Sequence, residues 1–129
     1  MKRWAVAWGP AATWAAVLFL VSSQPTLPVD LSSGLDKFAH FGAYLVFGFL
    51  ATFGATFSRA SLWVAGAVCW GYALSDELHQ SFVPGRDASI GDWFADAAGS
   101  IAGILLYLLF LRLLGTAHPR TDLGDARTT

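Results

Sequence analysis

Charged residues are few in this chain, and they provide no basic excess. Lys and Arg contribute 8 of the 129 residues and Asp and Glu contribute 9, which gives a formal net charge of -1. This balance argues against a nucleic-acid partner, because neutralising phosphates requires a basic surface. A single cysteine, Cys69, lies in an apolar run, so no intrachain disulfide can form and no redox centre is indicated.

Apolar residues dominate instead. They make up 55% of the chain, and the mean hydropathy of +0.52 is well above that of an ordinary soluble domain. A helix crosses the roughly 30 Å core of a bilayer with about 20 apolar residues. The sequence therefore predicts an all-α, polytopic membrane protein, a bundle of four transmembrane helices that run from about Trp4 to Val21, Leu35 to Phe57, Leu62 to Gln80 and Ser89 to Leu114.

The first apolar run allows two interpretations. It follows Met1-Lys2-Arg3, and a basic start before an apolar run also describes a signal peptide, with a weak cleavage site at Val21-Ser22-Ser23. The run is longer than the usual signal core, which favours a retained membrane helix. Residues 1–114 are then one transmembrane domain, and residues 115–129 form a polar tail without periodicity that we expect to be mobile.

The connections between the apolar runs carry helix-start and turn signals. Prolines keep the segment from 22 to 34 out of a helix. Ser33 with Asp36, and Ser89 with Asp92, have the spacing of a capping box, in which each side chain bonds the backbone N–H of the other. The turn at 58–61 is very short, so the second and third helices should be antiparallel.

Basic residues predict the orientation. If both termini lie on one side, that side carries six of the eight basic residues, and the opposite side carries only Lys37 and Arg86. The positive-inside rule then places both termini in the cytoplasm. As a consequence, most of the polar residues within the apolar runs gather at the outer face.

Polar residues recur at helical spacing on three of the predicted helices. Asp36, His40 and Tyr44 share one face, as do Glu77 and Gln80 on the third helix. On the fourth helix the repeating residues are Asp92, Asp96, Gly99 and Gly103, and the two glycines form a GxxxG pattern that lets a neighbouring backbone approach closely. Because carboxylates facing lipid are costly, the three polar faces should converge.

Several of these residues have a purely structural interpretation. Asp36 and Asp92 lie in the first turns of their helices, where free N–H groups favour a carboxylate. His40 could be an interfacial histidine bonded to a carbonyl, Arg86 could extend toward lipid head groups, and His79 lies off the Glu77 face and should be peripheral.

Asp96 and Glu77 are harder to explain in this way. Asp96 lies about two turns inside its helix, and Glu77 lies at a helix end that offers no free N–H groups. Lys37, His40 and Arg86 are the cations available to compensate them. The outer-face cluster is therefore either a closed salt-bridge network or an open pocket for an anionic head group.

The combined pattern resembles the VanZ-like family of small bacterial membrane proteins over about residues 36–114. It comprises Asp36-Lys37-x-x-His40-x-x-x-Tyr44, then Asp76-Glu77-x-His79-Gln80-x-x-x-Pro84-Gly85-Arg86, then Asp92-x-x-x-Asp96-x-x-Gly99-x-x-x-Gly103. Many members have Asn where this chain has Asp96. The resemblance implies a multi-pass protein of the bacterial cytoplasmic (inner) membrane, and the family is named for a glycopeptide-resistance accessory that lowers susceptibility to teicoplanin.

These observations lead to one preferred function and two alternatives. The preferred function is a pocket that binds an anionic lipid-linked or acylated envelope molecule among membrane lipids, with the expected ligand-binding residues Asp36, Lys37, His40, Tyr44, Glu77, Gln80, Arg86, Asp92 and Asp96. The first alternative is an enzyme acting on a lipid phosphate or ester, with His40, Glu77 and Asp96 as candidate catalytic residues. The second is a transport role involving Asp96. Because one chain has only four predicted helices, a transporter would have to be a homo-oligomer. A carboxylate-histidine set could also hold a divalent ion, but the spacings match no metal-binding motif, so the sequence predicts neither a metal site nor a cofactor.

The orientation can be tested by cysteine labelling. In a Cys69→Ala background, we expect Ser89→Cys to react with an impermeant maleimide added outside intact cells, because position 89 should lie on the outer face. Ser58→Cys should not react, because it should face the cytoplasm. The reverse labelling pattern would invert the predicted orientation.

Overall fold

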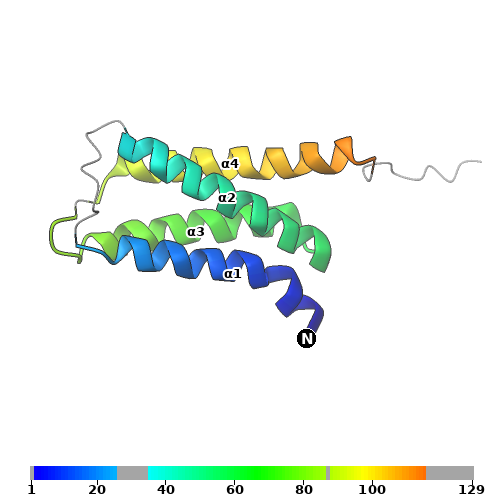
Figure 1. The fold of residues 1–129 in the computed structure, drawn as a ribbon, viewed down its shortest axis with the longest axis horizontal. Coiled ribbons are helices and arrows are strands. Elements are labelled where there is room, and N and C mark those ends of the chain that lie inside the picture. Colours follow the sequence, from blue (N-terminus) through cyan, green and yellow to red (C-terminus); the bar gives the residue numbers. More distant parts are fainter. Residues whose placement is uncertain (1, 26–34, 87, 116–129) are drawn as a thin grey trace, which may run out of the picture.

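The chain forms a bundle of long helices. A computed structural model describes residues 2–25, 35–86 and 88–115, and within these ranges there are four helices and no strand. The helices are α1 (Lys2–Ser22), α2 (Leu35–Ser58), α3 (Leu62–Gln80) and α4 (Ile90–Leu113). Successive helices run in opposite directions along the bundle (Figure 1). The predicted all-α class is confirmed, and each helix begins and ends within a few residues of its predicted bounds.

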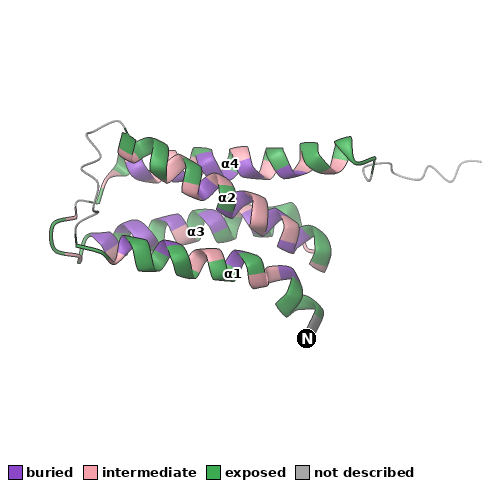
Figure 2. Ribbon diagram, in the orientation of Figure 1, coloured by how far each residue is buried: buried purple, intermediate pink, exposed green. Residues whose placement is uncertain are grey.

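Three of these helices are long and apolar enough to cross a membrane, namely Arg3–Ser22, Leu35–Ser58 and Ile90–Leu113. α3 is not among them, because its last two turns carry Asp76, Glu77, His79 and Gln80. Many large apolar side chains on the outside of the bundle are exposed, among them Phe38, Leu74 and Leu105. Figure 2 shows the buried residues on the sides where helices face one another. An apolar exterior of this kind is typical of a membrane protein.

Two tight turns fix the direction of α3. After α2, Arg59 adopts a left-handed conformation with φ of 60°, and Ser61 caps α3 by accepting a hydrogen bond from the Trp63 N–H at 3.4 Å. The chain therefore reverses within three residues, and α2 and α3 are antiparallel as predicted (Figure 1). After α3, Gly85 has φ of 79°, a conformation that favours glycine, and the turn around it places Arg86 beside the end of α3.

α2 and α4 are parallel and form the most extensive helix contact in the bundle (Figure 1). A Cβ atom on Gly99 would overlap the backbone oxygen of Phe41. A Cβ atom on Gly103 would likewise overlap the backbone oxygen of Leu45. The GxxxG pattern of α4 therefore lies directly against the backbone of α2, and the prediction of close helix approach is confirmed.

α1 packs against α2 and α3 through side chains that bond to backbone oxygens. The Trp14 indole N–H donates to the Ala43 carbonyl at 2.9 Å, and the Tyr72 hydroxyl donates to the Ala15 carbonyl at 2.6 Å. The buried Cys69 belongs to the core shared by α1, α2 and α3. These contacts support the expectation that α1 is a retained membrane helix, which stays a prediction.

One predicted local motif is wrong. Ser89 is the N-cap residue of α4, but its side chain makes no capping hydrogen bond. Its backbone N–H donates to Glu77 Oε2 at 2.9 Å, and Asp92 pairs with Lys37 at 3.3 Å. The Ser89 N–H and the Asp92 carboxylate, which would bond each other in the capping box, therefore bind partners on other helices. The other predicted box, at Ser33, and the predicted tail from 116 onward lie outside the described residues.

The glycine contact between α2 and α4 can be tested by adding one methyl group. Gly103→Ala should destabilise the protein by about 1–3 kcal/mol, because neither backbone can move without separating the helices. The matched control is Gly71→Ala on α3, where a Cβ would meet no atom within 4 Å, and alanine should be neutral or stabilising by up to about 1 kcal/mol. The measurement is the midpoint of thermal unfolding in detergent, followed by tryptophan fluorescence. Equal midpoints for the two variants would contradict the close contact.

Candidate functional site

The predicted polar residues gather at the end of the bundle where α1 and α3 end and α2 and α4 begin (Figure 1). This end carries all nine residues expected to bind a ligand, namely Asp36, Lys37, His40, Tyr44, Glu77, Gln80, Arg86, Asp92 and Asp96. The structure thus brings the three polar faces together. Their role in binding stays a prediction.

A salt bridge and a histidine–carboxylate hydrogen bond connect the parallel helices α2 and α4. Lys37 Nζ lies 3.3 Å from Asp92 Oδ1, and His40 Nδ1 lies 2.9 Å from Asp96 Oδ1. The partners on each helix are three or four residues apart, so the pairs lie one above the other along the contact. The outer pair is partly exposed, since 51% of the Lys37 side chain is accessible, whereas the Asp96 side chain is fully buried.

The His40 ring is held between two carboxylates. Its Nδ1 atom bonds Asp96, and its Nε2 atom lies 4.0 Å from Asp36 Oδ1, one helical turn earlier on α2. His40 therefore does not bond a backbone carbonyl, which was the structural interpretation of this residue. A buried carboxylate on one nitrogen fixes the ring orientation and leaves the other nitrogen toward the cavity described below.

Glu77 is compensated from the following helix. It lies in the last turn of α3, and its Oε2 atom accepts the Ser89 N–H at 2.9 Å. That N–H belongs to the N-cap residue of α4, which has unpaired backbone donors. The helix end that Glu77 itself occupies offers no such donor, so the start of α4 supplies it.

Arg86 is linked to α3 through a neutral side chain. One of its terminal nitrogens donates to Gln80 Oε1 at 3.0 Å, and the Gln80 amide nitrogen donates to Asp76 Oδ2 at 3.2 Å. Within the described part of the chain, no carboxylate oxygen lies within 4.0 Å of the Arg86 guanidinium. The cluster is therefore not a closed salt-bridge network at Arg86.

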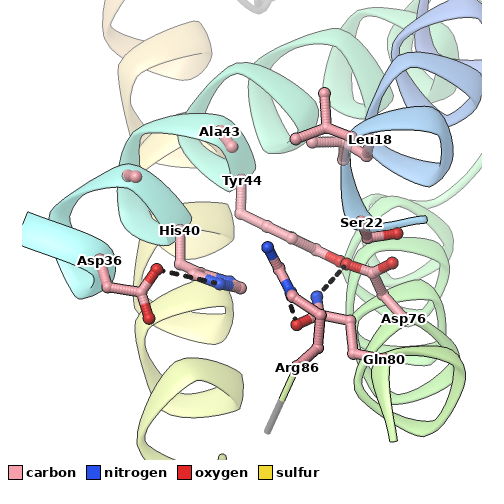
Figure 3. Close-up of a pocket in the computed structure, with 11 residues that line it drawn as sticks. Leu18, Ser22, Asp36, His40, Ala43, Tyr44, Asp76, Gln80 and Arg86 are labelled. Carbon is pink, nitrogen blue, oxygen red and sulfur yellow. Dashed lines mark hydrogen bonds and ion pairs between the residues drawn. The ribbon is translucent and has the colours of Figure 1, made fainter. Parts of the chain in front are cut away.

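A cavity of about 150 Å³ opens beside Arg86, between α1, α2 and α3. Its polar lining includes Asp36, His40, Tyr44, Asp76, Gln80 and Arg86, and its apolar lining includes Leu18, Val21, Ala39 and Ala43. Figure 3 shows Tyr44 extending from α2 into this space and Arg86 lying between His40 and the pair Asp76 and Gln80. Among the residues expected to bind a ligand, Lys37, Glu77, Asp92 and Asp96 do not line the cavity.

Sequence reasoning missed part of this lining. Asp76 is buried and bonds Gln80, and its position four residues before Gln80 could have placed it on the same helix face. Leu18, Val21 and Ser22 of α1 also line the cavity. Nothing in the apolar run of α1 distinguishes these residues, because the signal for their position is the packing of α1 on α2.

His79 lies away from the cavity, as predicted. Its Nε2 atom lies 3.0 Å from Ser23 Oγ, and its ring stacks on Phe19 at a centroid distance of 4.7 Å. The histidine therefore joins α3 to the end of α1 and is peripheral to the polar cluster.

Several buried polar atoms at this end of the bundle have no hydrogen-bond partner. Among the described residues they are Tyr44 OH, Asp76 Oδ1, Glu77 Oε1, Trp93 Nε1 and Asp96 Oδ2. Two overlapping groups of side chains are close enough to hold a metal ion, one made of Asp36, His40 and Asp92 and the other of His40, Glu77 and Asp96. Buried polar atoms in proteins are normally paired with protein groups, water or ions, so this set marks a place where such a partner can bind.

Comparison with known proteins agrees with the resemblance seen in the sequence. The model of the VanZ/LLP1 family matches residues 4–111, a range that includes almost all of α1 to α4 and every residue of the polar cluster. No curated protein and no solved structure matches the chain significantly. The family match extends the sequence resemblance, which began at Asp36, to include α1. The chain belongs to the VanZ/LLP1 family.

Proposed function

We propose that this protein binds the anionic head group of a lipid-linked or acylated cell-envelope molecule in the cavity beside Arg86. In this proposal all four helices cross the bacterial cytoplasmic membrane, both termini lie in the cytoplasm, and the cavity opens at the outer face. α3 has 19 residues, and at about 1.5 Å per residue a helix of that length reaches roughly across the bilayer core.

The observation that carries the proposal is that the Arg86 guanidinium bonds a neutral side chain. This guanidinium lines the cavity and is bonded there by the neutral amide oxygen of Gln80. A guanidinium presents a fork of donors that matches a phosphate or carboxylate in two parallel hydrogen bonds. The charge of Arg86 is therefore available to an anion in the cavity.

Tyr44 adds a second donor to the same space. Its hydroxyl is buried without a partner, and the side chain extends into the cavity (Figure 3). Asp36 and Asp76 also line the cavity and repel an anion, so we place the anionic group on the side of Arg86 and Tyr44. The unpaired Oδ1 atom of Asp76 would then accept a hydrogen bond from a hydroxyl group of the ligand.

The size of the cavity favours a head group over a whole lipid. Pockets that enclose a complete small-molecule ligand have volumes of roughly 300–1,000 Å³, whereas this cavity has about 150 Å³. Its apolar wall includes Leu18 and Val21 of α1, and the Val21 side chain is also exposed on the outside of the bundle. An acyl or polyprenyl tail would lie along this surface. Teicoplanin carries such a tail and vancomycin does not, which would explain a resistance phenotype selective for teicoplanin.

A membrane enzyme acting on a lipid phosphate or ester is the second candidate, and the His40–Asp96 pair favours it. Asp96 holds His40 Nδ1 at 2.9 Å, and His40 lines the cavity. A carboxylate that orients one nitrogen leaves the other to act as a general base. We expect no turnover of labelled undecaprenyl phosphates by the purified wild type; turnover that His40→Ala abolishes would replace the binding proposal with the enzymatic one.

The binding proposal predicts a specific effect of Arg86→Gln. Binding of undecaprenyl phosphate to the purified protein, measured by native mass spectrometry from a neutral detergent, should weaken by about 10- to 100-fold. This loss corresponds to removing hydrogen bonds from a charged donor, worth about 1.5–3 kcal/mol. The matched control is Arg59→Gln at the opposite end of the bundle, which should leave binding unchanged. Equal binding by the wild type and Arg86→Gln would refute the role of Arg86.

The same variants have an expected outcome in cells. A susceptible Gram-positive host that expresses the wild type should grow at higher teicoplanin concentrations, with no change for vancomycin, and Glu77→Gln or Arg86→Gln should remove the protection. If well-expressed wild type gives no protection while lipid-phosphate binding persists, the resistance role is wrong and the cavity assignment stands.

A further inference from the structure

The end of the bundle where α1 and α3 end and α2 and α4 begin carries more negatively than positively charged side chains among its described residues. Its described carboxylates are Asp36, Asp76, Glu77, Asp92 and Asp96, whereas its described cations are Lys37, Arg86 and, when protonated, His40. Asp76, Glu77, Asp92 and Asp96 are each at least 93% buried. Removing a carboxylate from water costs several kcal/mol unless an opposite charge compensates it, and Lys37 and His40 compensate only Asp92 and Asp96 directly.

Three of the ionisable groups at this end of the bundle converge on one point. His40 of α2, Glu77 of α3 and Asp96 of α4 each offer a ligand atom, and these atoms all lie within 4.8 Å of one another. Glu77 Oε1 and Asp96 Oδ2 are buried and have no hydrogen-bond partner in the described part of the chain. Two unpaired carboxylate oxygens beside an imidazole are the arrangement expected around a cation.

We propose that His40, Glu77 and Asp96 bind a divalent transition-metal ion, Zn²⁺ or Mn²⁺. Imidazole nitrogen suits zinc and other transition metals, and carboxylate oxygen suits both zinc and manganese. Ligand atoms around one Zn²⁺ lie roughly 3.3–3.5 Å apart at the usual bond lengths. The His40 and Asp96 atoms that now bond at 2.9 Å would move slightly apart to admit the ion, which would replace the proton between His40 Nδ1 and Asp96.

The surrounding bonds orient the ligands as metal sites require. The Ser89 N–H holds Glu77 Oε2 and leaves Oε1 free for the ion. With the ion on Nδ1, the His40 Nε2–H faces Asp36 Oδ1 at 4.0 Å. Metal-bound histidines commonly donate their second N–H to a carboxylate, and metal-bound carboxylates commonly accept a further hydrogen bond.

The neighbouring group made of Asp36, His40 and Asp92 fits an ion less well. Asp92 already pairs with Lys37 at 3.3 Å, and 37% of the Asp36 side chain is exposed. Neither of these carboxylates has a buried oxygen without a partner. The group that includes Glu77 and Asp96 is therefore the metal site, and Asp92→Asn provides a control within the same cluster.

A metal site at this position differs from the expectation drawn from the sequence, which predicted none. Motif spacings detect ligands that share one helix or loop. Here the three ligands come from three helices, so no linear spacing could indicate them. Metal binding also goes beyond the proposed function, because it can be measured without any lipid and does not require Arg86.

The test measures metal binding directly. Protein purified in detergent and stripped with a chelator is titrated with Zn²⁺ alone and with Mn²⁺ alone by calorimetry, and the bound metal is counted by elemental analysis. All samples carry His118→Gln, so that the third histidine of the chain cannot bind metal. We expect one ion per chain, and affinity at least 10- to 100-fold lower for Asp96→Asn and for Glu77→Gln.

Matched variants distinguish this site from metal binding elsewhere on the chain. His79→Gln, Asp92→Asn and Arg86→Gln should each keep the wild-type affinity within about threefold. A monodisperse size-exclusion profile is the criterion that Asp96→Asn is folded. If Asp96→Asn is not folded, Glu77→Gln alone tests the loss of metal affinity. The proposal is overturned if the wild type binds no stoichiometric ion, if neither Asp96→Asn nor Glu77→Gln weakens binding, or if Asp92→Asn weakens binding as much as they do. Metal binding by Arg86→Gln without lipid-phosphate binding would separate the two proposals.

Discussion

The interaction on which the polar end of the bundle depends is the pairing of Asp96 with His40. A carboxylate without exposed surface, two turns inside an apolar helix, must find a partner on a neighbouring helix. His40 can reach it at 2.9 Å because α2 and α4 approach through glycines at Gly99 and Gly103. The same close contact brings Lys37 to Asp92. The close packing of α2 and α4 therefore determines which polar side chains pair between them.

α3 completes this arrangement from the opposite direction. It ends where α4 begins, so its last turn presents Glu77 to the N-cap of α4 and Asp76 and Gln80 to the cavity. The left-handed Gly85 then returns the chain beside α3 and places Arg86 on Gln80. A short connection thus supplies both the cation of the cavity and the donor that Glu77 requires.

Much of the fold could be predicted from the sequence, because apolar runs, short turns and glycine spacing are local signals. The helix bounds and the antiparallel α2 and α3 follow from them, and the shared faces of Asp36 with His40 and of Asp92 with Asp96 follow from helical periodicity. The Ser89 capping box was wrong because a tertiary partner, Glu77, took the N–H that the box would use. The cavity lining by Leu18 could not be predicted, because it depends on where α1 packs.

The parallel alignment of α2 and α4 has an electrostatic consequence for this end of the protein. Peptide dipoles sum along a helix, so the starts of α2 and α4 carry partial positive charge and the ends of α1 and α3 carry partial negative charge. Asp36 and Asp92 lie near positive ends, whereas Glu77 lies near a negative one. The field at this end is therefore uneven, and Arg86, which bonds Gln80 in the last turn of α3, places its positive charge at a negative helix end.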